Sequence, residues 1–405
     1  MSRVLLITAN LGSLFDDLDR LSDLWVEYML KTVHSHDPEF VALHLQETGG
    51  KRFEENSDKV VPLIWRLHEG LKEFGHCYAF LDIDFNDSEQ FTALGSVFFI
   101  RSTISDRTKL YNFKSSSFQP LDQPGLYVEP KINSTKRIRK EKFSRDFWPG
   151  VRWGRKGYLH ARWLVGKQVL DLINLHLFHD ESNLAFHENP YQYSQNRRKA
   201  MNYLLQKYEK FTTTVDNNVT SNLFLFGDFN FRLNAISFLS KLTKHTNQHN
   251  TETVSDSESP KNSSDDSEPT PVLNGHDFKR QLSAIEYRSK NENCVLRIEK
   301  KKFEYENSRS LISNWREYKE DDQETKDLSL IEPPVEFPPT YPWSEDPFKH
   351  DSLTNTRMPA WCDRVLMNNK AWTVVQHTNY TYTSIGMDIC MGDHKPVVLA
   401  FTLPQ

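Results

Sequence analysis

The chain has 405 residues, a formal net charge of −5 and only four cysteines, none of them in a Cys-x-x-Cys pair. This length supplies one large hydrophobic core or two ordinary ones, and the cysteine pattern excludes both a disulfide scaffold and a thiolate metal site. The pattern fits a reducing compartment, and no apolar run approaches the roughly 18 residues that a membrane span requires.

Short apolar runs that end in polar residues predict a series of strands. The predicted strands are residues 4–8, 40–45, 95–100, 169–175, 222–226, 364–367 and 396–401. Several are almost entirely apolar, as expected for strands that are covered on both faces. They alternate with helical patterns at residues 21–34, 59–73 and 196–208. The alternation predicts an α/β fold of layered sheets and helices.

Charge is distributed unevenly along the chain. Residues 131–145 hold seven basic residues and one acid, and this segment is expected either to attract phosphates or to be an ordinary solvated loop. Residues 244–275 are acidic and rich in serine, and they have too few large apolar side chains to offset the entropy cost of ordering. We therefore predict a disordered insertion at 244–275 within a single domain spanning residues 1–405.

Two further patterns follow the insertion. The apolar periodicity of residues 278–305 predicts a helix, and the prolines between residues 333 and 339 predict an irregular loop before the last strands. Polar clusters stand directly after the apolar runs, and the carboxyl ends of strands in an open sheet share one crevice. The clusters are residues 8–10, 46–47, 174–177, 227–232, 361–364 and 392–396.

The first two clusters offer oxygen ligands for a hard cation. Asn10 and Glu47 each end an apolar run, and carboxylate and amide oxygens are the ligands that Mg²⁺ prefers. Taken alone, residues of this kind are more often helix caps or surface residues than metal ligands.

The later clusters offer groups for phosphate hydrolysis. Asp228 follows Gly227 and stands beside Asn230, which fits either a base with a positioning group or a turn that bonds its own backbone. Asp363 could orient His394, and the combination predicts hydrolysis of a phosphate monoester by water. His176 and His394 are unremarkable singly, and Arg364 fits either a two-pronged phosphate grip or a pair with a surface acid. A nucleophilic role for Cys362 is disfavoured because the charge of neighbouring Asp363 raises a thiol pKa.

Two segments, residues 227–233 and 359–366, resemble the signature sequences of the inositol polyphosphate 5-phosphatase family. Residues 155–157, 337–341 and 393–396 extend the resemblance over the chain apart from the acidic insertion. The resemblance is to type I members through residues 4–15, 44–50, 91–95, 176–183 and 390–397. It implies the DNase I-like fold, a four-layer arrangement of two β-sheets flanked by helices, with the active site at one rim.

The resemblance also implies roles for individual residues. Glu47 and Asn10 would hold Mg²⁺ with Asp393 nearby, Asp228 would activate water, and His394, held by Asp363, would contact the scissile phosphate. Asn230 and His176 would grip the same phosphate. The candidates for binding substrate phosphates are Arg364, Tyr341, Lys156, Arg155 and Asn174, with residues 137–142 as a further possibility.

Pro342 stands where family members that act on lipids commonly have lysine. The resemblance therefore implies hydrolysis of the 5-phosphate of inositol 1,4,5-trisphosphate and inositol 1,3,4,5-tetrakisphosphate, which would end calcium-mobilising signals. The sequence ends without the cysteine of a prenylation motif, so either a cytoplasmic protein with at most peripheral membrane contact or a truncated or alternative form is expected. A monomer is expected.

Three alternatives stay open, namely a phosphoinositide lipid 5-phosphatase, a catalytically silent inositol phosphate-binding protein, and a nuclease of the same fold. The localised basic charge argues against a nucleic-acid partner. The presence of every expected catalytic residue argues against a silent site.

Overall fold

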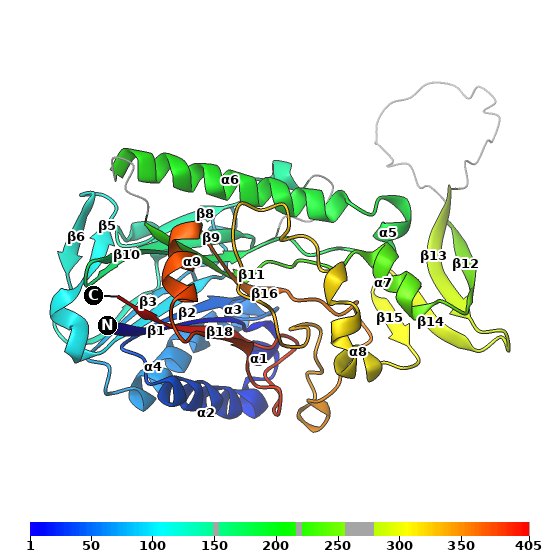
Figure 1. Cartoon of the computed structure of the whole chain (residues 1–405), viewed down its shortest axis with the longest axis horizontal. Coiled ribbons are helices and arrows are strands. Elements are labelled where there is room, and N and C mark those ends of the chain that lie inside the picture. The colour runs from blue at the N-terminus through cyan, green and yellow to red at the C-terminus, as the bar shows by residue number, and fades with distance from the viewer. Residues whose placement is uncertain (149–153, 216–220, 256–278, 405) are drawn as a thin grey trace, which may run out of the picture.

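A computed structural model describes residues 1–148, 154–215, 221–255 and 279–404. Within these residues the strands form two seven-stranded sheets and a four-stranded sheet. The two large sheets share one buried core, and long helices cover their outer faces (Figure 1). This arrangement confirms the predicted four-layer α/β sandwich.

The first large sheet contains the two ends of the chain. Its strand order is β17 (Thr381–Ser384), β18 (Val397–Leu403), β1 (Ser2–Asn10), β2 (Phe40–Gln46), β4 (Gly95–Ile100), β3 (His76–Leu81) and β7 (Gly125–Glu129). Strands β1 and β2 run parallel, whereas β18 lies antiparallel to β1. Helices α2 (Leu18–His36) and α4 (Val60–Gly70) cover its outer face, where Trp25 and Ile64 are fully buried.

The second large sheet has the strand order β16 (Asp363–Met367), β11 (Asn222–Asp228), β10 (Gln168–His176), β9 (Gly157–Val165), β5 (Thr108–Asn112) and β6 (Ser117–Pro120), and β8 (Arg139–Lys142) also pairs with β9. Helix α6 (Gln192–Val215) packs Ala200 and Leu204 against its outer face. The shorter helices are α1 (Gly12–Asp16), α3 (Phe53–Asn56), α5 (Ala185–Glu188), α7 (Ala235–Leu242), α8 (Ser310–Ser313) and α9 (Asn369–Gln376).

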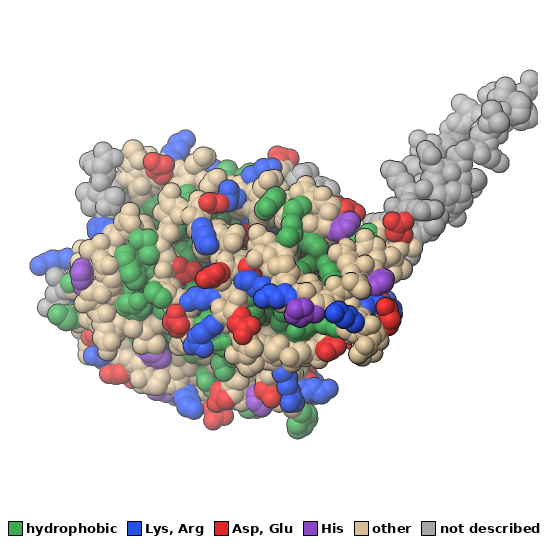
Figure 2. All heavy atoms as spheres, turned by 45° about the vertical axis from the view of Figure 1, so that its right-hand side comes forward, with side chains coloured by type: hydrophobic (Ala, Val, Ile, Leu, Met, Phe, Trp, Pro, Cys, Tyr) green, Lys and Arg blue, Asp and Glu red, His purple; other side chains and the backbone are tan. Residues whose placement is uncertain are grey.

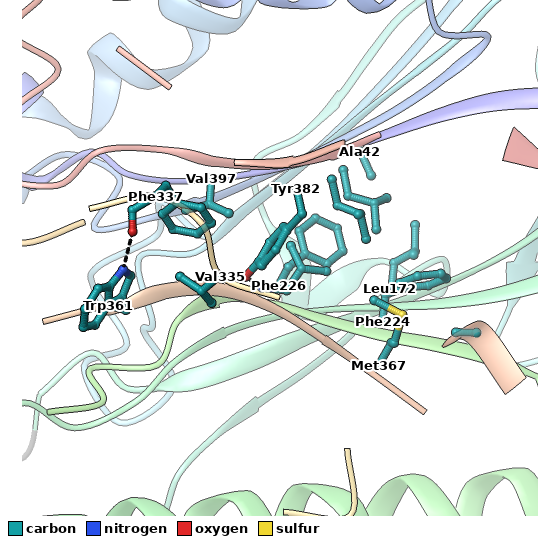
Figure 3. Packing of buried hydrophobic residues seen from close by; sticks show 14 of the residues in the cluster. Ala42, Leu172, Phe224, Phe226, Val335, Phe337, Trp361, Met367, Tyr382 and Val397 are labelled. Carbon is teal, nitrogen blue, oxygen red and sulfur yellow. Dashed lines mark hydrogen bonds between the residues drawn. The ribbon is translucent and has the colours of Figure 1, made fainter. Parts of the chain in front are cut away.

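The core explains why these strands read as continuous apolar runs. On β10, Leu172 points into the space between the sheets, whereas its neighbour Ile173 packs under α6, so both faces are buried. Figure 3 shows Leu172 with Phe224, Phe226 and Met367 in the shared core. Trp361 also lies there, and its indole Nε1 donates a 2.9 Å hydrogen bond to the carbonyl of Phe337. Burying each large side chain contributes about 1.5–3 kcal/mol.

The predicted helix at 278–305 is wrong. This region forms β13 (Lys279–Arg288), β14 (Cys294–Glu299) and β15 (Lys302–Tyr305), which pair antiparallel in the four-stranded sheet. Leu296 and Ile298 are buried, whereas Arg297 between them is only partly buried and forms ion pairs. This alternation has the two-residue period of a strand. The Arg297 side chain pairs across the strands with Glu286 at 2.7 Å.

Part of the predicted disordered insertion is also wrong, because β12 (Asn247–Ser255) pairs with β13 over its full length. Residues 256–275 of that prediction lie outside the described residues. The predicted irregular loop at the prolines is confirmed. The membrane-span criterion of length and apolarity is met by none of the helices in the described part of the chain.

Candidate active site

The candidate catalytic residues lie where two pairs of parallel strands end. On β1 and β2, Asn10 stands opposite Gln46, and on β10 and β11, His176 stands opposite Asp228. Asp363, the first residue of β16, lies opposite Asp228 in the antiparallel pair β11–β16. Because the carboxyl ends of both parallel pairs share one edge of the sandwich, side chains far apart in the sequence meet there.

Asp228 lies at the centre of this cluster. Its Oδ2 accepts hydrogen bonds of 3.1 Å from both Asn10 Nδ2 and Asn230 Nδ2, and it lies 3.2 Å from His176 Nε2. Its Oδ1 accepts the backbone N–H of Asn230 at 2.9 Å. Burial would raise the pKa of Asp228, but the charges of His176 and His394 outweigh burial and hold the pKa well below its usual range. Asp228 is therefore a fixed, ionised carboxylate.

Local backbone geometry aims these groups. A Cβ on Gly227 would lie 2.1 Å from the carbonyl oxygen of Leu175, so only glycine allows β11 to approach β10 here. Asn230 and Glu47 both have left-handed backbone conformations, with φ of 51° and 53°. Asparagine tolerates that conformation, whereas glutamate adopts it rarely. Strained residues of this kind cluster at functional sites, which supports a role for Glu47.

Asp363, His394 and Thr340 form a buried chain of hydrogen bonds. His394 Nδ1 lies 2.8 Å from Asp363 Oδ2, which also accepts a 2.7 Å bond from the Thr340 hydroxyl. Burial alone would lower the pKa of His394, but the charges of Asp363 and Asp228 raise it to about 10. His394 is therefore an imidazolium at neutral pH, with Asp363 as the partner of its Nδ1.

Two oxygens suited to a hard cation converge next to Gly12. A Cβ on residue 12 would lie 2.9 Å from Glu47 Oε2 and 3.2 Å from Asn10 Oδ1, so the missing side chain leaves space where the two oxygens meet. Burial would raise the pKa of Glu47, but His176, Lys156 and Arg155 lower it to about 2. An ionised carboxylate and an amide oxygen in this space fit Mg²⁺.

Asp393 approaches the same region from the segment that precedes β18. Its Oδ1 accepts a 2.6 Å hydrogen bond from the Ser13 hydroxyl, which also lies 2.6 Å from Glu345 Oε1. Burial raises the pKa of Asp393, and the charge of Glu47 adds to the rise. The carboxyl of Asp393 thus lies near Glu47, as the resemblance implied.

A second group of possible ligands consists of Asp228, Asp363 and His394, whose donor atoms all lie within 4.8 Å of one another. This group does not fit a cation. His394 Nδ1 is hydrogen-bonded to Asp363 and is not available as a ligand. The imidazole is also protonated at neutral pH, and its positive charge would repel a metal ion. Of the three residues, only the His394 imidazolium carries a charge that attracts a phosphate.

Two basic residues that precede β9 also line the site. Lys156 is buried and its Nζ contacts His176 Nε2, while Glu47 and Asp228 partly offset the burial that lowers its pKa to about 8. Arg155 lies 3.7 Å from Glu47 Oε2 and donates to the carbonyl of Gly50 at 2.8 Å. Both residues lie beside the predicted metal ligands. Tyr341 is also in the cluster, with its ring centroid 4.6 Å from that of His394.

The structure contradicts the predicted role of Arg364. Its guanidinium is 1% exposed and is engaged by two acids, with Asp322 in a short ion pair and Glu332 at 3.1 Å from Nε. These contacts lie on the side of β16 that faces the proline-rich loop. The charge of Arg364 is thus neutralised inside the protein, and the residue is a structural anchor.

We expect Arg364→Met to lower the free energy of unfolding by about 3–5 kcal/mol, because the change leaves Asp322 and Glu332 buried without their partner. Urea denaturation would measure this loss. The KM of the folded fraction should stay within about twofold of the wild-type value. A large rise in KM without loss of stability would restore the phosphate-binding role.

The structure also contradicts the predicted phosphate-binding roles of Asn174 and of the basic segment. Asn174 is fully buried between the sheets, where it accepts a 2.8 Å bond from Gln46 and donates to the carbonyls of Leu45 and Gly95, so it cannot reach a substrate. In the segment at residues 137–142, Arg137 pairs with Asp122 at 2.5 Å and Lys140 with Asp82 at 3.0 Å. These pairs neutralise part of the positive charge of the segment, so it is not available to bind phosphates.

Sequence reasoning missed three residues at the site. Arg232 Nη2 donates to Asn230 Oδ1 at 2.8 Å, and its guanidinium carbon lies 4.8 Å from the Tyr341 ring centroid. The hydroxyl of Thr340 donates a hydrogen bond to Asp363. Arg357 lies close enough to Arg232 and Tyr341 for both to shift its pKa. All three stand inside the quoted signature segments or beside them. Their chemistry gave no separate signal because arginine and threonine are ordinary surface residues.

Comparison with known proteins places this geometry in a family. Residues 125–268 and 281–400 match the model of Endonuclease/Exonuclease/phosphatase family 2. The chain is 43% identical to a probable type I inositol 1,4,5-trisphosphate 5-phosphatase of Caenorhabditis elegans, with 100% of both chains covered. It is 36% identical to human inositol polyphosphate-5-phosphatase A over 99% of this chain and 93% of the human one.

A solved structure gives a more distant likeness. The ferrous nitric oxide complex of a Cimex nitrophorin mutant aligns with a TM-score of 0.50 and 12% identity over 100% of this chain and 99% of the other, which concerns the fold alone. The family match and the full-length relatives carry more information. They show that the chain belongs to the type I inositol polyphosphate 5-phosphatases, phosphoric monoester hydrolases with the DNase I-like fold.

Proposed function

We propose that this enzyme removes the 5-phosphate from soluble inositol polyphosphates, namely inositol 1,4,5-trisphosphate and inositol 1,3,4,5-tetrakisphosphate, with Mg²⁺ as its cofactor. The observation that carries the proposal is the fixed carboxylate of Asp228 within reach of the His394 imidazolium. The name of the Caenorhabditis elegans relative supports the trisphosphate as substrate. Its hydrolysis would end a calcium-mobilising signal.

In the proposed mechanism, Asp228 orients the attacking water toward the phosphorus atom and accepts a proton from that water. Asn230 and His176 hold Asp228 in place beside the scissile phosphate. His394 stabilises the charge that develops on the phosphate oxygens. Asp363 keeps His394 protonated and oriented. When bound, Mg²⁺ would be held by Glu47 and Asn10, with Asp393 nearby, and would neutralise phosphate charge.

A nucleophilic side chain is not required by this mechanism. Burial raises the pKa of the Cys362 thiol well above its ordinary value, and the charges of Asp228 and Asp363 raise it further. The thiol would therefore stay protonated beside the reacting phosphate. Direct attack by water fits these electrostatics better than a covalent enzyme intermediate.

The positive charge around the pocket fits a substrate with several phosphates. Lys156, Arg155, Arg232 and Arg357 surround the catalytic cluster, and Arg232 lies over the face of Tyr341. Tyr341 is followed by Pro342 rather than by lysine, which supports the preference for soluble substrates over lipids. We further propose a cytoplasmic monomer with at most peripheral membrane contact.

We expect Glu47→Gln to lower the affinity for Mg²⁺ by at least about 10-fold, because loss of an outer-shell partner alone costs about 10- to 100-fold in other metal sites. Isothermal titration calorimetry of the metal-free protein measures binding without turnover. Glu69→Gln on the exposed surface of α4 removes the same charge and serves as the control. Equal affinities in both variants would place the cation elsewhere.

A substrate panel tests the proposed function. Phosphate release should be measured from the trisphosphate, the tetrakisphosphate and phosphatidylinositol 4,5-bisphosphate vesicles at one Mg²⁺ concentration, beside nicking of plasmid DNA. We expect turnover of both soluble compounds to exceed that of the lipid. Tight binding without phosphate release would indicate a silent binding protein, and preferential nicking of DNA would indicate a nuclease.

A further inference from the structure

We propose that Lys300 and Lys301, in the turn between β14 and β15, form an outer subsite for a phosphate of the inositol polyphosphate other than the scissile one. This inference rests on the proposed function and extends it to substrate recognition. Neither lysine belongs to the catalytic cluster, and both lie in the region that the sequence predicted to be a helix.

The turn is fixed at the active-site side of the four-stranded sheet. The backbone N–H of Asn183 donates to the carbonyl of Lys300 at 3.0 Å, and Asn183 Nδ2 donates to the carbonyl of Lys302 at 3.1 Å. Arg357 Nη1 donates to the carbonyl of Lys300 at 2.8 Å. Asn183 lies in the segment that follows β10, and Arg357 lies in the segment that precedes β16. Segments next to the strands that carry His176 and Asp363 therefore hold this turn.

Arg357 connects the turn to the catalytic residues. Burial lowers the pKa of Arg357, and the nearby charge of Arg232 lowers it further, while Tyr341 opposes both effects. Arg232 donates to Asn230, and Tyr341 packs on His394. Arg357 therefore links the backbone of Lys300 to residues that contact the catalytic cluster.

Open space lies beside these residues. A cavity of about 180 Å³ is lined by Asn183, which holds the turn, and by Arg232, which contacts Asn230. Its lining also contains the acids Asp180 and Glu324, which pair with Arg197, whereas Lys300 and Lys301 lie outside it. A ring that is held by its scissile phosphate near Asp228 could extend its remaining phosphates past Arg232 toward the turn. Figure 2 shows acidic and basic side chains gathered in the middle of this face, with basic ones continuing toward the side of the four-stranded sheet.

The two ammonium groups are available for an anion. Lys300 and Lys301 are exposed, and in the described part of the chain neither has a carboxylate within ion-pair distance. The next residue differs, because Lys302 Nζ pairs with Glu304 at 2.7 Å. A lysine carries its charge on a flexible four-carbon stem, which suits recognition of a phosphate as a point charge.

The test compares Lys300→Gln/Lys301→Gln with the control Lys290→Gln/Lys302→Gln. The control removes the same charge from the same sheet, but Lys290 lies in the turn at the opposite end of β14 and Lys302 is already paired. For the subsite variant we expect the KM for the trisphosphate to rise about 3- to 10-fold while kcat stays within about twofold, because two exposed charge contacts are lost. The control should leave both constants near wild type.

The outcomes separate the inference from the proposed function. A wild-type enzyme that hydrolyses neither soluble substrate would refute the proposed function before any variant is compared. Normal wild-type turnover with an unchanged KM in the subsite variant would overturn the inference alone, as would an equal rise in the control. A loss confined to phosphatidylinositol 4,5-bisphosphate vesicles would assign the pair to a membrane surface and likewise overturn the soluble subsite.

Discussion

Asp228→Asn is expected to lower kcat by about 10²- to 10⁴-fold, which is the range for loss of a positioned acid–base group. The substitution keeps the size of the side chain but removes its charge. It also places an amide where Oδ2 now accepts hydrogen from Asn10 and Asn230, so donors would face donors. Single-turnover phosphate release at saturating substrate would measure the chemical step directly.

Asp171→Asn is a matched control for this prediction. Asp171 is an equally buried carboxylate on β10, and it lies beside a histidine, with 2.6 Å between Asp171 Oδ1 and His160 Nε2. It lies under α6, away from the cluster, so we expect lower stability with kcat preserved in the folded fraction. Similar losses of kcat in both variants would mean that the effect of Asp228 is structural.

His394→Gln is the second change with a large expected effect. It removes the imidazolium that faces Asp228 and Asp363, and preorganised charge of this kind contributes about 10²- to 10³-fold to kcat. The KM should change less than kcat, because the interaction strengthens as charge develops on the phosphate. A fall in kcat below about threefold would show that the imidazolium does not stabilise the transition state.

Asp363→Asn tests the charge of His394 by changing the pKa of the His394 imidazole. The pKa of His394, about 10 in the fold, lies above its ordinary value of 6.5, so its stabilising contribution is complete below about pH 6.5 and is lost as the pH rises through about 10. Without the charge of Asp363, the imidazolium should lose its proton at a lower pH. Nuclear magnetic resonance of the imidazole nitrogens would follow this titration separately from Lys156, whose pKa is about 8.

In the wild-type protein we expect the His394 signals to stay those of an imidazolium through about pH 9. In Asp363→Asn they should titrate at lower pH, and the decline of kcat with rising pH should move in the same direction. Thr340→Val, which removes the hydroxyl bond to Asp363 but keeps its charge, should shift the His394 pKa less. Identical titrations in all three proteins would show that Asp363 does not set the charge of His394.

Much of the fold was predictable because its signals are local. The strands around residues 4–8, 169–175 and 222–226 are apolar on both faces, which is the pattern expected of strands buried between two layers. The helix predicted at 278–305 is wrong because the local signal there is weak. The strands β14 and β15 of this region are short, and a short segment gives too few apolar positions to separate the period of a strand from that of a helix.

The sequence by itself determined the layered α/β fold, the family and the residue types of the catalytic cluster. Each of these depends on local patterning or on signature segments. The tertiary structure decided which charges are free. Arg364 stands in a signature segment, yet Asp322 and Glu332, which precede it by 42 and 32 residues, neutralise it in the interior.

The same reasoning applies to the outer part of the site. Lys300 and Lys301 carry no motif, but contacts from Asn183 and Arg357, more than 50 residues away on either side, hold their turn beside the pocket. Whether a charged side chain binds substrate depends on its neighbours in space, because an adjacent acid cancels a charge that the sequence alone shows as available. Those neighbours are set by the fold.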